Sequence, residues 1–152
     1  MNSLQAAVEP GSKPWVLAVK MVLLDQEGRC LLIRRSSCCR NFVGKWEWPG
    51  GKTDPGEDFA TTARRETREE TGLETEITGF AGATSFDMPR VHVVMLCVEG
   101  RAGAGKVRLS EEHDEFAWVP LEDLRKWPLA DQVKHLMCDY AKRRKSELCR
   151  PL

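Results

Sequence analysis

Apolar positions along this chain form several runs of strand length, separated by short polar segments that carry turn residues. Residues 15–24 and 29–35 are two such runs, and the segment Asp25-Gln26-Glu27-Gly28 between them predicts a β-hairpin. The other runs predict strands over residues 46–49, 74–86 (as one or two short strands), 91–98 and 116–119. A segment of small residues, 99–105, is expected to be a flexible loop.

Two stretches have helical spacing instead. Residues 58–71 contain no Gly or Pro, Asp58 can cap the N-terminus, and Gly72 stands where a helix would end. Residues 130–145 are amphipathic, and a short helix is expected over residues 120–126. The inward positions of the last helix are predicted to be Val133, Leu136, Met137 and Tyr140.

This order of elements predicts an α/β fold, an α/β/α sandwich around a mixed β-sheet. A chain of 152 residues suits one domain. We expect a flexible N-terminal segment over residues 1–12, the domain over residues 13–146, and a C-terminal tail over residues 147–152.

The stretch from Pro49 to Leu73 carries the candidate chemistry. It begins with a glycine-rich turn and continues into the predicted helix, where Glu66, Glu69 and Glu70 share one face. Like charges at this spacing cost the helix about a few tenths of a kcal/mol unless a cation lies between them. Oxygen ligands beside an open loop suit Mg²⁺, which usually shares its shell with substrate phosphates. We therefore predict a divalent metal site here.

The same stretch closely resembles the Nudix box: a Gly, five residues, a Glu, seven residues, then Arg-Glu-U-x-Glu-Glu-x-Gly-U, where U is a bulky aliphatic residue. The matching positions are Gly51, Glu57, Arg65, Glu66, Glu69, Glu70, Gly72 and Leu73. Thr67 departs from the pattern, since an aliphatic residue belongs there. It is β-branched and can pack inward, provided that its hydroxyl finds a partner such as a carbonyl one turn back.

The resemblance implies the Nudix fold and a hydrolase that cleaves phosphoanhydrides with Mg²⁺, for which Mn²⁺ is a possible substitute. The implied metal ligands are Glu66, Glu69, Glu70 and the carbonyl of Gly50 or Gly51, with Arg65 holding a carboxylate and Glu57 tying the loop to the helix or joining the metal network. The general base comes either from this helix or from a later loop. In that loop Glu112 is a candidate base and metal ligand, with Glu111 and Glu115 as rivals and a solvated acidic loop as the alternative.

Other residues are candidates for substrate contacts. Arg34 and Arg35 alternate in direction at the end of a predicted strand, so one of them could hold a phosphate while the other faces elsewhere. Lys52, beside the glycines, is another candidate for a phosphate contact, and a surface role is equally consistent for it. Of the two tryptophans in residues 46–49, we expect them to point to opposite sides, one into the core and the other, Trp46, into a cleft where it stacks on a base.

The family resemblance leaves several substrates open. The segments KWEWPGGK and FDMPRVHVVML favour a MutT-like (deoxy)nucleoside triphosphate pyrophosphohydrolase. The alternatives are an ADP-ribose or nucleotide-sugar pyrophosphatase, for which Pro89 counts weakly, and a Nudix domain that binds a nucleotide without cleaving it.

Composition limits the partners and the cellular location that we expect. The formal net charge is zero, which gives no reason to expect extended nucleic acid or a membrane as partner, so we expect a small nucleotide substrate and a monomer or homodimer. The six cysteines show no Cys-x-x-Cys spacing and are read as free thiols without a zinc site. No secretory segment is evident, and a cytoplasmic location is expected.

Overall fold

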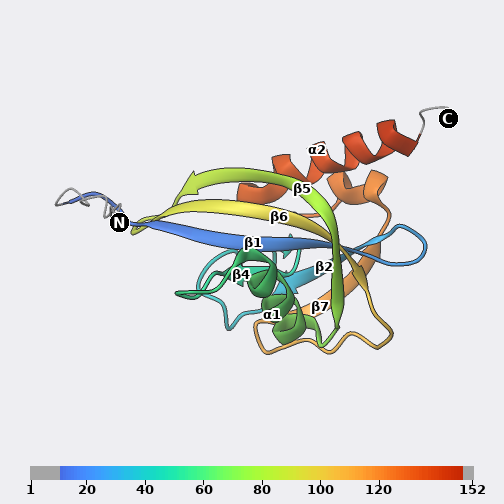
Figure 1. Cartoon of the computed structure of the whole chain (residues 1–152), viewed down its shortest axis with the longest axis horizontal. Coiled ribbons are helices and arrows are strands. Elements are labelled where there is room, and N and C mark those ends of the chain that lie inside the picture. The colour runs from blue at the N-terminus through green and yellow to red at the C-terminus, as the bar shows by residue number, and fades with distance from the viewer. Residues whose placement is uncertain (1–10, 149–152) are drawn as a thin grey trace, which may run out of the picture.

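A computed structural model describes residues 11–148 of the chain as one mixed β-sheet between two helices (Figure 1). The strands are β1 (Trp15–Leu24), β2 (Cys30–Arg35), β3 (Trp46–Glu47), β4 (Gly50–Lys52), β5 (Thr75–Asp87), β6 (His92–Ala102) and β7 (His113–Val119). The helices are α1 (Phe59–Thr71), the 3-10 helix η1 (Leu121–Lys126) and α2 (Asp131–Leu148). The α/β/α sandwich predicted from the order of elements is confirmed.

Strand β1 organises the sheet. It pairs in parallel with β6 along its whole length and antiparallel with β4, and it meets β2 only at the pair Leu24 and Cys30. The sheet order is β3-β2-β1-β6-β5, with β4 also paired to β1 and β7 to β2. A strand in the middle of a sheet is covered on both faces, which explains why β1 is nearly continuous in apolar residues.

The two faces of the sheet carry separate cores. On one face Val22, Leu32 and Trp48 pack against Val133 and Met137 of α2. On the other face, Met21, Leu31 and Ile33 pack with Ala63 of α1. The two helices therefore lie on opposite sides of the sheet, as Figure 1 shows.

Strand boundaries agree with the sequence-based expectation in one case and differ in two. β5, expected over residues 74–86 as one or two strands, is a single strand of 13 residues with register shifts near Gly79 and Gly82. β6 runs through Glu99–Ala102, which was expected to be loop, because these residues pair with β5 on one side and β1 on the other. β7 begins at His113, inside the acidic run, because Arg35 of β2 pairs with it there. Cross-strand pairing decided each case.

The segment around the glycines also differs. Gly50–Lys52, expected to be a glycine-rich turn, forms the short strand β4 against β1. Trp46 and Trp48 belong to the same core, so the expectation of opposite sides is wrong: residues two apart in an extended chain share a face. The ring of Trp46 lies edge-on to that of Trp127, at 4.6 Å between centroids.

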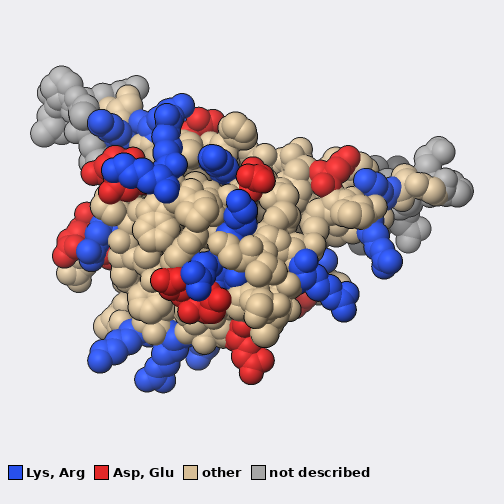
Figure 2. All heavy atoms as spheres, turned by 180° about the vertical axis from the view of Figure 1, so that it is seen from behind, with Lys and Arg blue, Asp and Glu red and all other residues tan. Residues whose placement is uncertain are grey.

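Several expectations concern residues outside the described range 11–148. Most of the predicted N-terminal segment 1–12 lies there, as do Cys149 and the end of the predicted tail. Within the described range the cysteines are free thiols: Cys30, Cys38, Cys39, Cys97 and Cys138. Over the same residues no helix is long and apolar enough to cross a membrane. Lys and Arg stand beside Asp and Glu over the face in Figure 2, in keeping with the zero net charge.

Candidate active site

Helix α1 begins and ends where the sequence predicts. The Asp58 carboxylate accepts a hydrogen bond from the Thr61 backbone N–H at 2.7 Å, and Gly72 closes the helix with φ of 72°. The buried face contains Ala63, Thr67 and Glu70, whereas Phe59 in the first turn is exposed. The helix therefore turns one of its three clustered carboxylates into the protein.

Thr67, the departure from the box pattern, is fully buried on that face. Its hydroxyl lies 3.9 Å from the sulfur of Met21 in β1, rather than on a carbonyl one turn back. The substitution is thus accommodated by a weak acceptor in the core between α1 and the sheet.

Glu70 is fixed against the glycine segment. Its Oε2 accepts a hydrogen bond from the Gly50 N–H at 2.7 Å, and the residue is only 5% exposed. Burial raises the pKa of its carboxyl to about 7, because the charged form loses hydration. Gly50 itself has φ of 136°, and a Cβ there would lie 2.1 Å from the Val19 carbonyl oxygen, so only glycine fits.

Glu66 lies beside the next glycine. A Cβ on Gly51 would meet the Glu66 carboxyl carbon and Oε2 at 2.6 Å, so this carboxylate rests directly against the backbone of β4. Partial burial raises the pKa of Glu66, and a hydrogen bond from Arg65 opposes that change. Gly50, Gly51, Glu66 and Glu70 therefore occupy one small region.

Arg65 links the remaining carboxylates. Its Nη1 lies 2.8 Å from Glu66 Oε1 and 3.3 Å from Glu69 Oε2, which confirms the expected contact with Glu69. Its Nε and Nη2 donate to the two oxygens of Glu57 at 2.8 and 2.9 Å. The hydrogen bonds from Arg65 lower the pKa of Glu57 to about 2. Glu57 also accepts from the Asp54 N–H at 3.2 Å, so it ties the loop to the helix.

A buried charged group next to β4 was not found from the sequence. The Lys20 ammonium donates to the Gly50 carbonyl at 2.8 Å and lies 3.2 Å from Glu47 Oε2. Arg35 Nη1 and His113 Nε2 approach the other oxygen of Glu47, at 3.0 and 3.5 Å. Burial alone would raise the pKa of Glu47, but Lys20, His113 and Arg35 outweigh it and lower that pKa to about 2.

The sequence carried a signal for this group. Lys20 is the single charged residue within the apolar run 15–24, and Glu47 stands between two tryptophans. A charge in the middle of an apolar strand must find a buried partner or lie on an open face. Which partner it finds depends on how β1, β3 and β7 are arranged around β2, with which all three pair, and the spacing alone does not give this.

The candidate phosphate contacts separate into engaged and free cations. Arg34 pairs with Asp114 at 2.7 Å and Glu115 at 2.6 Å, and Arg35 is bound to Glu47. The Lys52 side chain is exposed, and no described residue pairs with it. Among the three predicted cations, Lys52 is the one whose charge is available to a ligand.

Trp46 and Glu112 do not have the predicted surroundings. Trp46 is 6% exposed, with Arg34 over its ring at 5.9 Å, so it does not line an open cleft. Glu112 is exposed and contributes its backbone: its carbonyl accepts hydrogen bonds from Ser36 N–H at 2.9 Å and Cys39 Sγ at 3.2 Å. Its side chain is not tied to the helix carboxylates, and its rival Glu115 is occupied by Arg34.

The donor set can be tested against a divalent cation. Among residues 11–148, no three His, Cys, Asp or Glu side chains converge closely enough to hold an ion by themselves. Two carboxylates instead lie against adjacent glycines, Glu66 at Gly51 and Glu70 at the Gly50 N–H, and Arg65 links Glu69 to Glu66. An all-oxygen half-shell fits Mg²⁺, which completes its coordination with water and substrate phosphate.

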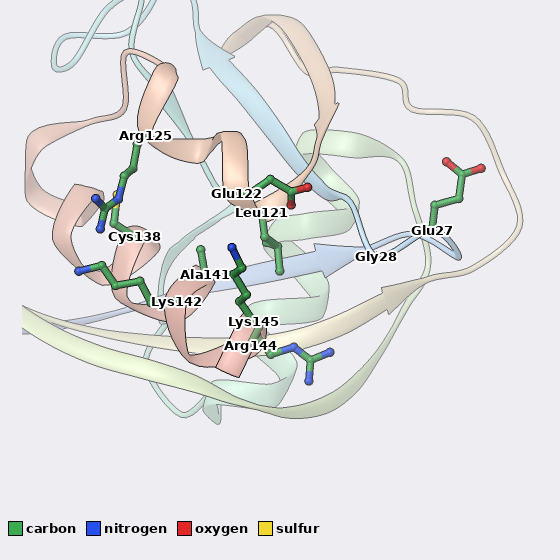
Figure 3. Close-up of a pocket in the computed structure, with 10 residues that line it drawn as sticks. All are labelled: Glu27, Gly28, Leu121, Glu122, Arg125, Cys138, Ala141, Lys142, Arg144 and Lys145. Atoms are coloured by element: carbon green, nitrogen blue, oxygen red, sulfur yellow. The ribbon is translucent and has the colours of Figure 1, made fainter. Parts of the chain in front are cut away.

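Two surface hollows flank the fold. One of about 570 Å³ is bordered by Arg64, Arg65, Arg68 and Glu69, on the outer side of α1. The other, of about 550 Å³, lies between η1, α2 and the β1–β2 turn (Figure 3). In Figure 3 Leu121 and Ala141 lie near its centre, and none of the predicted site residues borders it. The first hollow is therefore the one adjacent to the box carboxylates.

Known proteins resemble the chain over most of its length. The family profile described as NUDIX domain matches residues 14–140. A relative named nucleoside triphosphatase NudI, from Klebsiella pneumoniae (strain 342), is 30% identical over 118 residues, which covers 70% of this chain and 84% of the relative. A NudI from Escherichia coli O9:H4 (strain HS) is 31% identical over 116 residues, covering 67% and 80%.

Solved structures share the fold of this chain. A MutT protein from Methanosarcina mazei Go1 superimposes with a TM-score of 0.81 at 31% identity, covering 88% of this chain and 98% of that one. A C. elegans Ap4A hydrolase shares the fold with a TM-score of 0.71 at 24% identity, covering 86% and 98%. The family profile, the relatives at 30 and 31% identity and the MutT structure agree, and the chain belongs to the NUDIX family as a MutT-like Nudix hydrolase.

Proposed function

We propose that this Nudix hydrolase cleaves nucleoside triphosphates, ribo or deoxy, to a nucleoside monophosphate and pyrophosphate in a Mg²⁺-dependent reaction. The observation that carries the proposal is the packing of Glu66 and Glu70 against the Gly50–Gly51 backbone. This packing brings carboxylate and peptide oxygens to one edge of β4, beside an exposed lysine. A triphosphate is a suitable ligand for this edge, because its negative charge can be neutralised both by the lysine and by a metal ion held on the carboxylate and peptide oxygens.

The proposed metal ligands are Glu66, Glu69, Glu70 and the Gly50 carbonyl. When bound there, Mg²⁺, or Mn²⁺ in its place, neutralises phosphate charge and lowers the pKa of an attacking water. The protein contributes rigidity: Gly50 holds Glu70 through its N–H, and Arg65 holds Glu66. Arg65 itself is kept in position by Glu57, so we assign it a positioning role.

We assign the proton acceptor to Glu69 in preference to Glu112. Glu69 is 59% exposed and is anchored at the same Arg65 nitrogen as Glu66, so it can face solvent while staying at the site. Glu112 has an exposed side chain without such an anchor. A base must reach the water that it deprotonates, and an anchored carboxylate meets this requirement more readily. Lys52 is proposed to contact the phosphates.

The choice of triphosphate rests on the relatives named nucleoside triphosphatase, at 30 and 31% identity. The Ap4A hydrolase neighbour, at 24% identity, supports the fold alone. ADP-ribose and nucleotide sugars remain the alternative substrates. The test incubates purified protein with Mg²⁺ and the eight common ribo- and deoxynucleoside triphosphates, ADP-ribose, a nucleotide sugar and a dinucleoside tetraphosphate, and identifies products by mass. Pyrophosphate released from a triphosphate supports the proposal; cleavage of ADP-ribose alone overturns it.

A variant pair tests the site. Glu70→Gln is expected to lower kcat by at least about a hundredfold, the size of loss when one group that stabilises transition-state charge is removed. Gln can still accept the Gly50 N–H, so the fold should be retained, as circular dichroism would check. Glu76→Gln on β5, an exposed carboxylate, is the matched control and should leave kcat unchanged. Equal rates for wild type and Glu70→Gln in Mg²⁺ would refute the assignment.

A further inference from the structure

Lys20 is a buried lysine at the edge of the proposed metal site. It lies in β1, where its neighbours in sequence are apolar, and only 6% of its surface is exposed. A buried ammonium needs anionic or carbonyl partners on several sides, because hydration is lost. Here those partners are the Gly50 carbonyl at 2.8 Å and Glu47 Oε2 at 3.2 Å.

The same glycine also holds a proposed metal-binding carboxylate. The Gly50 N–H donates to Glu70 Oε2 at 2.7 Å, while the Gly50 carbonyl accepts from Lys20 at 2.8 Å. The backbone of Gly50 is therefore held on both its N–H and its carbonyl. Lys20 therefore has the kind of partners that a metal ion would have, a peptide oxygen and a carboxylate oxygen.

We propose that Lys20 is a resident cation of this site, which occupies one cation position at the Gly50 carbonyl and thereby lowers the affinity of the metal-free protein for divalent ions. The inference rests on the proposed function, because that function assigns Gly50, Glu66 and Glu70 to metal binding. Removing a positive charge next to these oxygens strengthens the attraction of a divalent cation to them. Lys20 acts here through its contact with one proposed metal ligand, the Gly50 carbonyl.

The test measures Mn²⁺ binding by calorimetry without nucleotide. Lys20→Met is expected to bind Mn²⁺ at least about tenfold more tightly than wild type. A merely structural role for Lys20 predicts the reverse, because a disordered site binds metal more weakly. Lys134→Met, which removes an exposed lysine on α2, across the sheet from α1, is the matched control for the loss of one charge and should leave the dissociation constant unchanged.

A second variant covers the case in which Lys20→Met does not fold because Glu47 loses a partner. Lys20→Met/Glu47→Gln removes both charges of the pair, keeps the local net charge and clears the Gly50 carbonyl. It should still bind Mn²⁺ at least about threefold more tightly than wild type. Unchanged or weaker binding in whichever of these variants folds overturns the inference.

A third measurement uses the wild-type protein and needs no variant. In ¹⁵N-labelled, metal-free protein, the Lys20 ammonium should be protected from solvent exchange, because it is buried and donates to the Gly50 carbonyl. Exchange as fast as that of the exposed lysines would overturn the inference. These binding measurements contain no nucleotide, so the two proposals can fail separately. If the Lys20 variants bind Mn²⁺ more tightly but the protein hydrolyses no nucleotide, the proposed function is wrong. If the protein is a hydrolase but its Mn²⁺ affinity does not depend on Lys20, the inference is wrong.

Discussion

Gly50 and Gly51 are adjacent glycines that lack a side chain for different reasons. At Gly50 the obstacle is backbone: a Cβ would lie 2.1 Å from the Val19 carbonyl oxygen, and φ is 136°. At Gly51 the obstacle is the carboxyl end of Glu66, at 2.6 Å, and φ is not in the left-handed region. Backbone cannot move cheaply, whereas the end of a long side chain can. The absence of a side chain at Gly50 is therefore required for folding, whereas its absence at Gly51 is required for the position of Glu66.

We predict that Gly51→Ala folds normally and loses activity. The added methyl displaces the Glu66 carboxylate, so kcat should fall by about tenfold or more, while the free energy of unfolding changes by less than about 1 kcal/mol. Denaturant unfolding and steady-state hydrolysis measure the two quantities. Gly50→Ala is the contrasting variant and should be destabilised by about 3 kcal/mol or more. Full activity in Gly51→Ala, with intact stability, would contradict the placement of Glu66.

At the scale of elements, β5 shows how a long edge strand receives a helix. Its register shifts fall near Gly79 and Gly82, and Gly82 has φ of 148°. Leu136 of α2 rests on Gly82, where a Cβ would lie 2.6 Å from its Cδ1. Arg143 of α2 donates to the Ala81 carbonyl at the same place. The register shift at Gly82 therefore shapes the surface of β5 against which α2 packs.

This packing predicts that alanine substitutions at two glycines of β5 differ in their effect on stability. Gly82→Ala combines backbone strain with a clash against Leu136, and should lower the free energy of unfolding by about 1 to 3 kcal/mol. Gly79→Ala meets nothing closer than 3.9 Å and should be neutral or slightly stabilising. Thermal unfolding should show a lower Tm for the first variant alone, by about 2 to 4 °C per kcal/mol. Equal melting temperatures would show that α2 does not depend on the bulge.

At the scale of the whole molecule, stability is coupled to pH through buried carboxyls. Burial raises the pKa of Glu70 from 4.5 to about 7. Between these values the folded, metal-free protein holds a proton that the unfolded chain has released, so the stabilisation is complete below about pH 4.5 and is lost as pH rises to about 7. Glu47, whose pKa is lowered from 4.5 to about 2, has the opposite effect: its stabilisation is present above about pH 5.5, where both states are ionised, and is lost as pH falls toward 2.

The expected consequence is measurable as a difference between two proteins. In EDTA, wild type should lose on the order of 3 kcal/mol of unfolding free energy through Glu70 between about pH 4.5 and pH 7.5. Glu70→Gln cannot titrate and should lack this part of the slope. Urea unfolding at several pH values gives both curves, and Glu76→Gln should follow wild type. Parallel curves for wild type and Glu70→Gln would contradict a raised pKa at this carboxyl.

Local rules were sufficient for the box helix. Asp58, Gly72 and the absence of helix breakers predicted its ends, because caps and helical hydrogen bonds join residues within four positions. The face shared by Glu66, Glu69 and Glu70 followed from the helical period alone. The family and the fold class were also within reach of the sequence, since a glycine-to-glutamate pattern of fixed spacing specifies one arrangement of loop and helix.

The partners of the buried charges depended on long-range pairing. Lys20 meets Gly50 across 30 residues, and His113 meets Glu47 across 66. The same holds for the burial of Trp46 under Arg34 and for the extension of β6 into a glycine-rich segment. Spacing along a chain fixes what lies within a turn or two of helix or one strand. Which oxygen a buried ammonium finds is decided only when β1, β3 and β4 are packed together, because its hydration must then be replaced by whatever groups the fold brings within reach.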